Sequence, residues 1–183
     1  APPRAHRAPP CRRRAPVAAA GRGTPRSARP GSLRGLVQST TNGGQSWKIV
    51  ENFSRLPSMT YVHDVLTSQH NENVVYAVFN NHKRGDFKPY IYKSADKGET
   101  WLPIMANLPV RGSVYCIAED HVDPNLLFAG TEFGAYFSND AGQNWKQLKA
   151  GLPTTAIRDI AVQKTEKDLI LAGRDISRRV AAE

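Results

Sequence analysis

The sequence predicts an all-β fold: a β-propeller fragment of about three four-stranded blades, preceded by a disordered tail. Three observations carry this prediction. The pattern Ser/Thr-x-Asp/Asn-x-Gly-x-x-Trp occurs three times, as TTNGGQSW at 40–47, SADKGETW at 94–101 and SNDAGQNW at 138–145. Each of these boxes is followed by a Leu-Pro step and then by two short apolar segments. Finally, no stretch of 11 or more residues shows a helical period.

The spacing of the boxes sets the size of the repeated unit. Their tryptophans are 54 and 44 residues apart, and units of this length with four short strands are typical of propeller blades. The segments are rich in Val, Ile, Tyr and Phe and are bounded by turn residues, as strands are. First strands are expected at 61–67, 113–119 and 156–162, second strands at 73–79, 125–130 and 168–173, and third strands at 89–94 and 134–138.

The longer first interval has a visible cause. Between the second and third strands one unit carries NNHKRGDFKP at 80–89, where the next unit has only TEF at 131–133. We expect this insertion to be a polar, exposed loop.

The order of the segments suggests an incomplete ring over residues 35–173. It supplies the last two strands of one blade, two full blades at about 60–106 and 112–149, and the first two strands of another. Closed propellers have about four to eight blades, so we expect a fragment with apolar faces and strand edges at its open ends. Further blades or self-association would cover these ends. Residues 174–183 are expected to be a polar C-terminal tail.

The net charge of +9 is concentrated at the N-terminus. Residues 1–34 hold nine Arg and seven Pro, with no Lys and no acidic residue, and we expect them to be a disordered tail. The rest of the chain has 16 basic and 16 acidic residues, so a nucleic-acid partner is not expected. No apolar run approaches the roughly 18–20 residues of a membrane helix, and no membrane partner is expected.

The chemistry of the boxes predicts a structural hairpin. The Asp or Asn accepts backbone amides of the turn, the Gly supplies a positive φ, the hydroxyl closes the loop, and the Trp buries a large ring. One carboxylate per box falls short of a calcium loop, the two cysteines Cys11 and Cys116 lack metal-ligand spacing, and we expect neither metal nor cofactor. The structural residues are Thr40, Asn42, Gly44 and Trp47, then Ser94, Asp96, Gly98 and Trp101, then Ser138, Asp140, Gly142 and Trp145.

Three boxes in register with this strand pattern resemble the Asp-box, or BNR repeat, of sialidase-like propellers. The closest resemblance is to the sortilin N-terminal-like (VPS10-like) and glycosyl-hydrolase-like BNR proteins of bacteria. It covers residues 35–173 and implies that the box hairpins lie away from the ligand face. It also suggests a secreted or periplasmic location. Members of that family include sialidases, xyloglucan hydrolases, sortilin-type receptors and photosystem assembly factors, so the resemblance identifies a fold and not an activity.

The candidate site lies on the face opposite the boxes. Aligning the first strands on their apolar residues places His63, Tyr115 and Arg158 at one position, and Asp64, Cys116 and Asp159 at the next. Nearby loops add further candidates. The alternative interpretation is structural, because inner-strand Asp residues often tie adjacent blades and a lone His in a strand more often packs. The candidate ligand-binding residues are His63, Tyr115, Arg158, Arg111 and His82, with Lys83 beside them, and the candidate catalytic residues are Asp64, Asp159 and Glu132.

Two classes of function fit these residues. The first is a non-catalytic interaction propeller that binds a protein, peptide or glycan across this face. The second is a glycoside hydrolase, which needs paired carboxylates about 5–9 Å apart or, as a sialidase, an arginine cluster with a tyrosine nucleophile. No motif beyond the box matches an enzyme subfamily, and the Arg-Ile-Pro signature of sialidases is absent. We therefore favour the first class.

Overall fold

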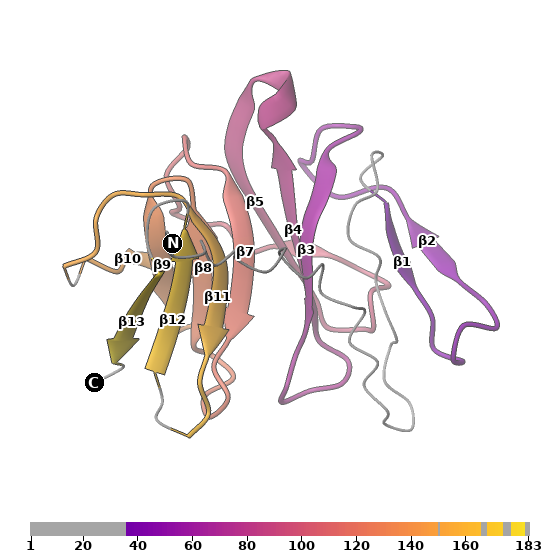
Figure 1. Ribbon diagram of the computed structural model, residues 1–183. Coiled ribbons are helices and arrows are strands. Elements are labelled where there is room, and N and C mark those ends of the chain that lie inside the picture. Colours follow the sequence, from indigo (N-terminus) through magenta and orange to yellow (C-terminus); the bar gives the residue numbers. More distant parts are fainter. Residues whose placement is uncertain (1–35, 150, 166–167, 174–176, 182–183) are drawn as a thin grey trace, which may run out of the picture.

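The computed structural model describes residues 36–149, 151–165, 168–173 and 177–181, and the expected tail at 1–34 lies outside them. In this part of the chain, the regular structure is β-strand except for one short 3-10 helix. The strands form four antiparallel sheets that stand side by side as successive blades (Figure 1). The predicted all-β propeller fragment is confirmed. No helix within the described ranges has the length and apolar character needed to cross a membrane.

Two of the sheets are complete four-stranded blades, each with its strands in chain order. One contains β3 (Tyr61–Thr67), β4 (Val75–Asn81), β5 (Asp86–Ser94) and β6 (Leu102–Pro103). The next contains β7 (Val114–Glu119), β8 (Leu127–Thr131), β9 (Gly134–Ser138) and β10 (Lys146–Gln147). In each blade the box lies between the third and fourth strands, as the sequence predicts.

The other two sheets flank these blades. On one side, β1 (Val37–Ser39) and β2 (Lys48–Val50) enclose the first box and so occupy the third and fourth positions of a blade. On the other side lie β11 (Ile157–Val162), β12 (Asp168–Gly173) and β13 (Ser177–Ala181). The assignment of 174–183 to a tail is corrected for Ser177–Ala181, which pairs with β12 from Ala172↔Ser177 to Asp168↔Ala181. Backbone pairing with an open strand edge needs no apolar pattern, and for this reason the residue pattern did not predict this strand.

The insertion at 80–89 is more ordered than a loop. Strand β4 runs on to Asn81, one turn of 3-10 helix follows at His82–Arg84, and β5 begins at Asp86. Asn81 pairs with Asp86 across the resulting hairpin, which rises above the other turns in Figure 1. The extra residues therefore lengthen two paired strands, because backbone pairing continues for as long as both strands stay extended.

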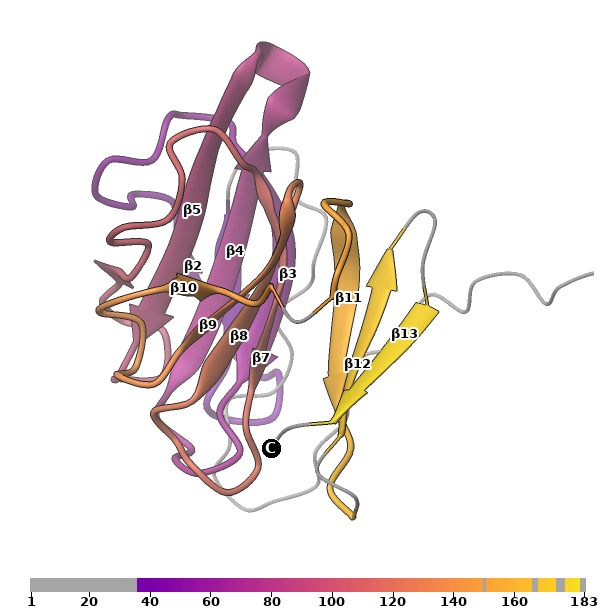
Figure 2. The ribbon, with the colours of Figure 1, turned by 90° about the vertical axis from the view of Figure 1, so that its left-hand side faces the viewer.

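The core lies in the seams between blades. Along β4, Val75, Ala77 and Phe79 pack toward the β1–β2 sheet, while Tyr76 and Val78 pack toward the β7–β10 blade. A third apolar cluster fills the seam between the β7–β10 blade and the β11–β13 sheet. Figure 2 shows the β11–β13 sheet beside the complete blades. Strands β4, β7 and β8 are covered on both faces, so they read as largely continuous apolar runs rather than alternating ones.

The box tryptophans show how successive blades are joined. Trp145 is 3% exposed and donates its Nε1–H to the carbonyl of Ile104 in the preceding blade at 2.7 Å. Trp101 is 8% exposed, and its ring centroid lies 5.5 Å from that of Phe53, which follows β2. Each ring thus packs against the blade before it. Trp47 is 44% exposed, which corrects the expectation that every box buries its Trp: the described residues contain no blade before β1.

The polar residues of the boxes form closed hydrogen-bond clips. Ser94 Oγ donates to Asp96 Oδ1 at 2.7 Å and accepts the Gly98 N–H at 2.8 Å, while Asp96 accepts the Thr100 N–H at 2.8 Å. In the third box, Ser138 Oγ donates to Asp140 Oδ1 at 2.7 Å and accepts the Gly142 N–H at 2.8 Å, while Asp140 accepts the Asn144 N–H at 2.8 Å. Burial works to raise the pKa of Asp96, but the bonds from Thr100 and its neighbours outweigh it and lower that pKa to about 2.

Candidate functional site

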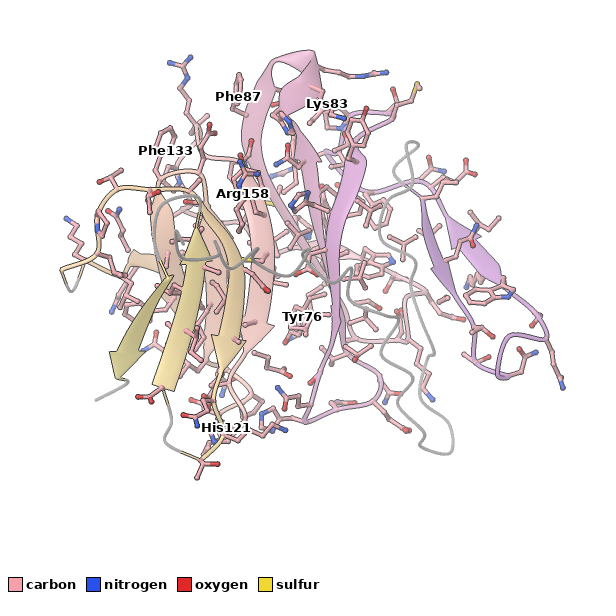
Figure 3. The ribbon with its side chains drawn as sticks, viewed as in Figure 1. Tyr76, Lys83, Phe87, His121, Phe133 and Arg158 are labelled. Atoms are coloured by element: carbon pink, nitrogen blue, oxygen red, sulfur yellow. The ribbon has the colours of Figure 1, made fainter. Side chains whose placement is uncertain are left out.

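The blades have two ends that differ in structure. The β4–β5 hairpin, the β8–β9 turn and the starts of the inner strands β3, β7 and β11 lie together, and we call this the hairpin end. The three boxes and the turns between first and second strands lie at the other end, called the box end. Figure 3 shows Lys83, Phe87, Phe133 and Arg158 at the hairpin end and His121 at the box end.

Each inner strand is bulged at the same place. The pairing register shifts between Val62 and Asp64 in β3, between Val114 and Cys116 in β7, and between Ile157 and Asp159 in β11. The extra residues of these three bulges are His63, Tyr115 and Arg158. A bulge re-aims the side chain of its extra residue and bends the strand. The position that the sequence alignment singles out is therefore a repeated backbone irregularity.

The three bulge residues meet. The rings of His63 and Tyr115 lie edge to face with centroids 5.3 Å apart, and the Arg158 guanidinium carbon lies 3.7 Å from the centroid of the Tyr115 ring. Tyr115 is 4% exposed, whereas His63 and Arg158 are exposed. The result is a stack with a buried aromatic centre, a cation–π contact and two accessible polar groups.

The electrostatics of this stack set its protonation state. The neighbouring blades desolvate the His63 ring although part of it stays exposed, and this lowers its pKa; the positive charge of Arg158 lowers it further, so His63 is neutral at physiological pH. Burial raises the pKa of Tyr115, partly opposed by Arg158, so its hydroxyl keeps its proton. The stack therefore presents one fixed cation, one neutral imidazole and one phenol that can donate or accept hydrogen bonds.

Asn80, a residue that the sequence analysis missed, organises the neighbouring groups. It is 1% exposed, and its Nδ2 donates to the carbonyl of Val114 in the next blade at 3.4 Å. Its Oδ1 accepts the backbone N–H of His82 at 3.0 Å and also contacts His82 Nδ1. A side-chain hydrogen bond with Asn80 also works to lower the pKa of the Tyr115 hydroxyl. The one available signal was an Asn at the end of an otherwise apolar strand.

Two of the candidate carboxylates, Asp64 and Asp159, accept backbone hydrogen bonds. Asp64 Oδ1 accepts the Val65 N–H at 2.9 Å, and its Oδ2 accepts the Ile117 N–H of the next inner strand at 3.3 Å. Asp64 thus ties two blades, as the structural interpretation of the sequence had it. Asp159 Oδ1 accepts the Ile160 N–H at 3.0 Å. Glu132 lies in the β8–β9 turn, where its negative charge works to raise the pKa of Tyr115. Cys116, at the equivalent position of β7, is 4% exposed within the apolar seam.

Arg111 lies at the rim of the hairpin end, next to two exposed aromatic residues. The N–H of the following residue, Gly112, donates to the carbonyl of Phe87 at 2.9 Å. A Cβ on Gly112 would lie 3.5 Å from the ring of Phe133. Phe87 and Phe133 are 39% and 44% exposed. The sequence analysis missed both, because an isolated Phe in a polar turn resembles an ordinary packing residue.

The box end holds a separate cavity. It has a volume of about 310 Å³, lies between the β1–β2 sheet and the β3–β6 blade, and is lined by Ser39, Lys48, Asn73, Asp96 and Glu99, among others. Asp96 there is occupied by the hydrogen bonds of its own box, so we place the candidate site at the hairpin end. Within the described ranges no group of three His, Cys, Asp or Glu side chains could hold a metal ion.

Comparison with known proteins informs the fold. No family model matches the sequence, and no curated protein matches it. Among solved structures, the chain is similar to YCF48 bound to the D1 peptide, with a TM-score of 0.55 and 18% identity over 76% of this chain and 42% of that one. It is also similar to the GH74 enzyme of Niastella koreensis, with a TM-score of 0.63 and 15% identity over 87% and 29% of the two chains.

A third similar structure is the GH74 xyloglucanase of Xanthomonas campestris, with a TM-score of 0.57 and 13% identity over 75% of this chain and 22% of that one. The chain thus spans less than half the length of each of these three proteins. Identities at this level carry the fold and not the chemistry. The narrower resemblance to the BNR repeat stays a prediction, and the comparisons show that this chain has a β-propeller fold.

Proposed function

We propose that the chain is part of a non-catalytic propeller that binds a protein, peptide or glycan at its hairpin end. The observation that carries this proposal is the stack of His63, Tyr115 and Arg158, contributed by the inner strands of three successive blades. A repeated bulge brings three different polar side chains to one level, and two of them, His63 and Arg158, stay exposed for a partner. Arginine and tyrosine are also the residues most often enriched at the centre of protein interfaces.

The same geometry argues against a glycoside hydrolase. A hydrolase of this kind needs two carboxyl groups free to act on the substrate, yet both oxygens of Asp64 accept backbone N–H groups. A tyrosine nucleophile needs an activated hydroxyl, and the raised pKa of Tyr115 keeps that hydroxyl protonated. YCF48, which shares the fold, binds the D1 peptide, so a propeller of this kind can hold a peptide.

The test is a binding screen with an activity control. Wild-type protein would be offered a phage-displayed library of random dodecapeptides and a panel of oligosaccharides comprising cellotetraose, sialyllactose and a xyloglucan heptasaccharide. Affinities of the recovered binders would be measured by calorimetry. We expect Arg158→Ala to weaken binding at least tenfold and Lys97→Ala, at the box end, to leave it unchanged.

Two results would contradict this proposal. Binders that lose affinity with Lys97→Ala and keep it with Arg158→Ala would move the site to the box end. Hydrolysis of aryl glycosides that is abolished by Asp64→Asn or Asp159→Asn would make the protein an enzyme.

A further inference from the structure

The described blades segregate charge between their two ends. At the hairpin end, the segments 82–88, 110–112 and 132–133 together with Arg158 carry five cationic side chains and two carboxylates, and the inner strands add the carboxylates of Asp64 and Asp159, which accept backbone N–H groups. At the box end, the turns 68–73, 95–100, 119–125 and 139–144 carry seven carboxylates and one lysine, and three more lysines, Lys48, Lys146 and Lys164, lie beside the boxes or in the β11–β12 turn. Residues 35–183 hold equal numbers of acidic and basic residues, so this asymmetry comes from the arrangement of the chain. The cations are Lys83, Arg84, Lys88, Arg111 and Arg158.

The cations of the hairpin end are accessible, and each of these five residues is exposed. Lys83 lies with its Nζ 4.8 Å from the centroid of the Tyr61 ring, and Arg84 contacts the sulfur of Met59 at 3.4 Å. Asp86, the carboxylate within the hairpin, accepts hydrogen bonds from the Tyr90 hydroxyl at 2.7 Å and the Lys88 N–H at 3.2 Å. By contrast, the box end contains the lysine–carboxylate contacts Lys48–Glu99 at 3.1 Å and Lys97–Glu72 at 3.8 Å.

Apolar groups are interspersed with these cations. Phe87, Val110 and Phe133 are 39%, 71% and 44% exposed. They are connected through Gly112, which bonds to the Phe87 carbonyl and lies against the Phe133 ring. Val110 is two residues before that glycine. Aliphatic and aromatic side chains beside arginines suit a partner that has both charged and apolar side chains.

We infer that the occupant of the hairpin end is an acidic protein segment that also carries aromatic or aliphatic side chains. The inference rests on the proposed function and names its ligand class. Carboxylates of the segment would pair with the five cations, and its apolar side chains would cover Phe87 and Phe133. The acidic box end repels the same segment, so the charge asymmetry orients the approach as well as stabilising the contact.

The test uses three fluorescein-labelled probes and anisotropy titration. The first peptide is (Glu-Glu-Phe)₄, the second replaces each Glu with Lys, and the third replaces each Phe with Ala. We expect binding of the first alone, weakened at least tenfold between 50 and 300 mM NaCl, because exposed charges are screened over about 10 Å at 0.1 M salt. The charge-reversal variant Lys83→Glu/Arg84→Glu/Lys88→Glu should abolish this binding.

The matched control is Lys48→Glu/Lys97→Glu/Lys146→Glu, which changes the net charge by the same amount at the box end. We expect it to retain the affinity of the wild type. Arg111→Glu leaves the hairpin unchanged and should weaken binding at least threefold. It replaces the hairpin variant as the test if that variant fails to fold. Circular dichroism would verify the fold of each protein.

Several outcomes would overturn the inference. Equal losses of affinity in the two triple variants would mean that the net charge of the protein, and not the position of the cations, determines peptide binding. Equal affinity for the Phe and Ala peptides would remove the apolar part of the proposal. Self-association that the hairpin variant abolishes, without peptide binding, would make a second copy the occupant. Oligosaccharide binding that depends on Arg158, without binding of the acidic peptide, would retain the proposed function and reject this ligand class.

Discussion

Replacing Glu119 with alanine should loosen the seam between the two complete blades. Glu119 ends β7 and is 2% exposed. Its Oε1 accepts the Ser68 hydroxyl at 2.9 Å and the Tyr76 hydroxyl at 3.1 Å, and its Oε2 accepts the Gln69 N–H at 2.6 Å. The three donors belong to the neighbouring blade, two of them in the turn between β3 and β4. One buried carboxylate therefore fixes that turn and a buried tyrosine together.

The expected magnitude follows from these three bonds. A hydrogen bond to a charged group contributes about 1.5–3 kcal/mol, but removing the carboxylate also removes the several kcal/mol that its desolvation costs. Since Tyr76 is 1% exposed, its hydroxyl would be left without this acceptor inside the seam. We expect Glu119→Ala to lower the free energy of unfolding by about 3–5 kcal/mol, because three donors lose their acceptor and each donor left unsatisfied in a buried site costs about 1–3 kcal/mol. Glu119→Gln keeps one acceptor oxygen and should cost about 1–3 kcal/mol.

The assay is urea unfolding followed by tryptophan fluorescence. The control is Glu99→Ala, because the Glu99 side chain is 62% exposed in its contact with Lys48 and such a pair contributes about 0–1 kcal/mol. A double-mutant cycle with Tyr76→Phe should give a coupling energy of about 0.5–3 kcal/mol. A loss in Glu119→Ala no larger than that in Glu99→Ala, or a coupling energy near zero, would refute the reasoning.

Three further predictions can be checked by the same unfolding assay. Trp101→Ala should lower the free energy of unfolding by about 3–5 kcal/mol, as large-to-small changes in a core do. Trp47→Ala should change it by no more than about 0.5 kcal/mol, as substitutions at exposed positions do. Equal losses would contradict the packing of each buried ring on the preceding blade. Gly142→Ala should cost more than Gly44→Ala by about 1–3 kcal/mol, because the two have φ of 94° and 96° but only the added Cβ of Gly142 meets an isoleucine side chain, at 2.9 Å; similar losses would leave φ as the only effect. The free energy of unfolding should fall as pH drops from the ordinary Asp pKa of 3.8 toward 2, because the lowered pKa of Asp96 means that the folded state favours the carboxylate. Asp96→Asn should flatten this part of the pH profile. An unchanged profile would refute the role of the Asp96 carboxylate.

The repeat made most of the architecture predictable. Segments 61–67, 134–138 and 168–173 are strands with the expected bounds, and the other expected strands lie within a few residues of their observed positions. The polar box residues are local, because the Ser, Thr, Asp and Asn side chains bond within their own turn. The alignment also placed His63, Tyr115 and Arg158 at one level, since equivalent positions in stacked blades are neighbours in space.

The remaining features depend on contacts between segments that are distant in the sequence. Asn80 became part of the candidate site because β4 ends beside β7, and nothing in its own strand indicates that. Strand β13 forms because β12 offers an open edge. The burial of Trp101 and Trp145 and the exposure of Trp47 depend on whether a blade precedes each ring.

By itself, the sequence determined the fold class, the strand order and the box hairpins, because these follow from short-range periodicity and from turn chemistry within eight residues. Only the tertiary structure decided which end of the blades carries positive charge, which carboxylates are occupied by backbone amides, and where the inner strands bulge. Those properties arise when separate blades stack and share seams. The physical reason is that a repeated local pattern specifies each blade, whereas a binding surface is built from the residues in which the blades differ.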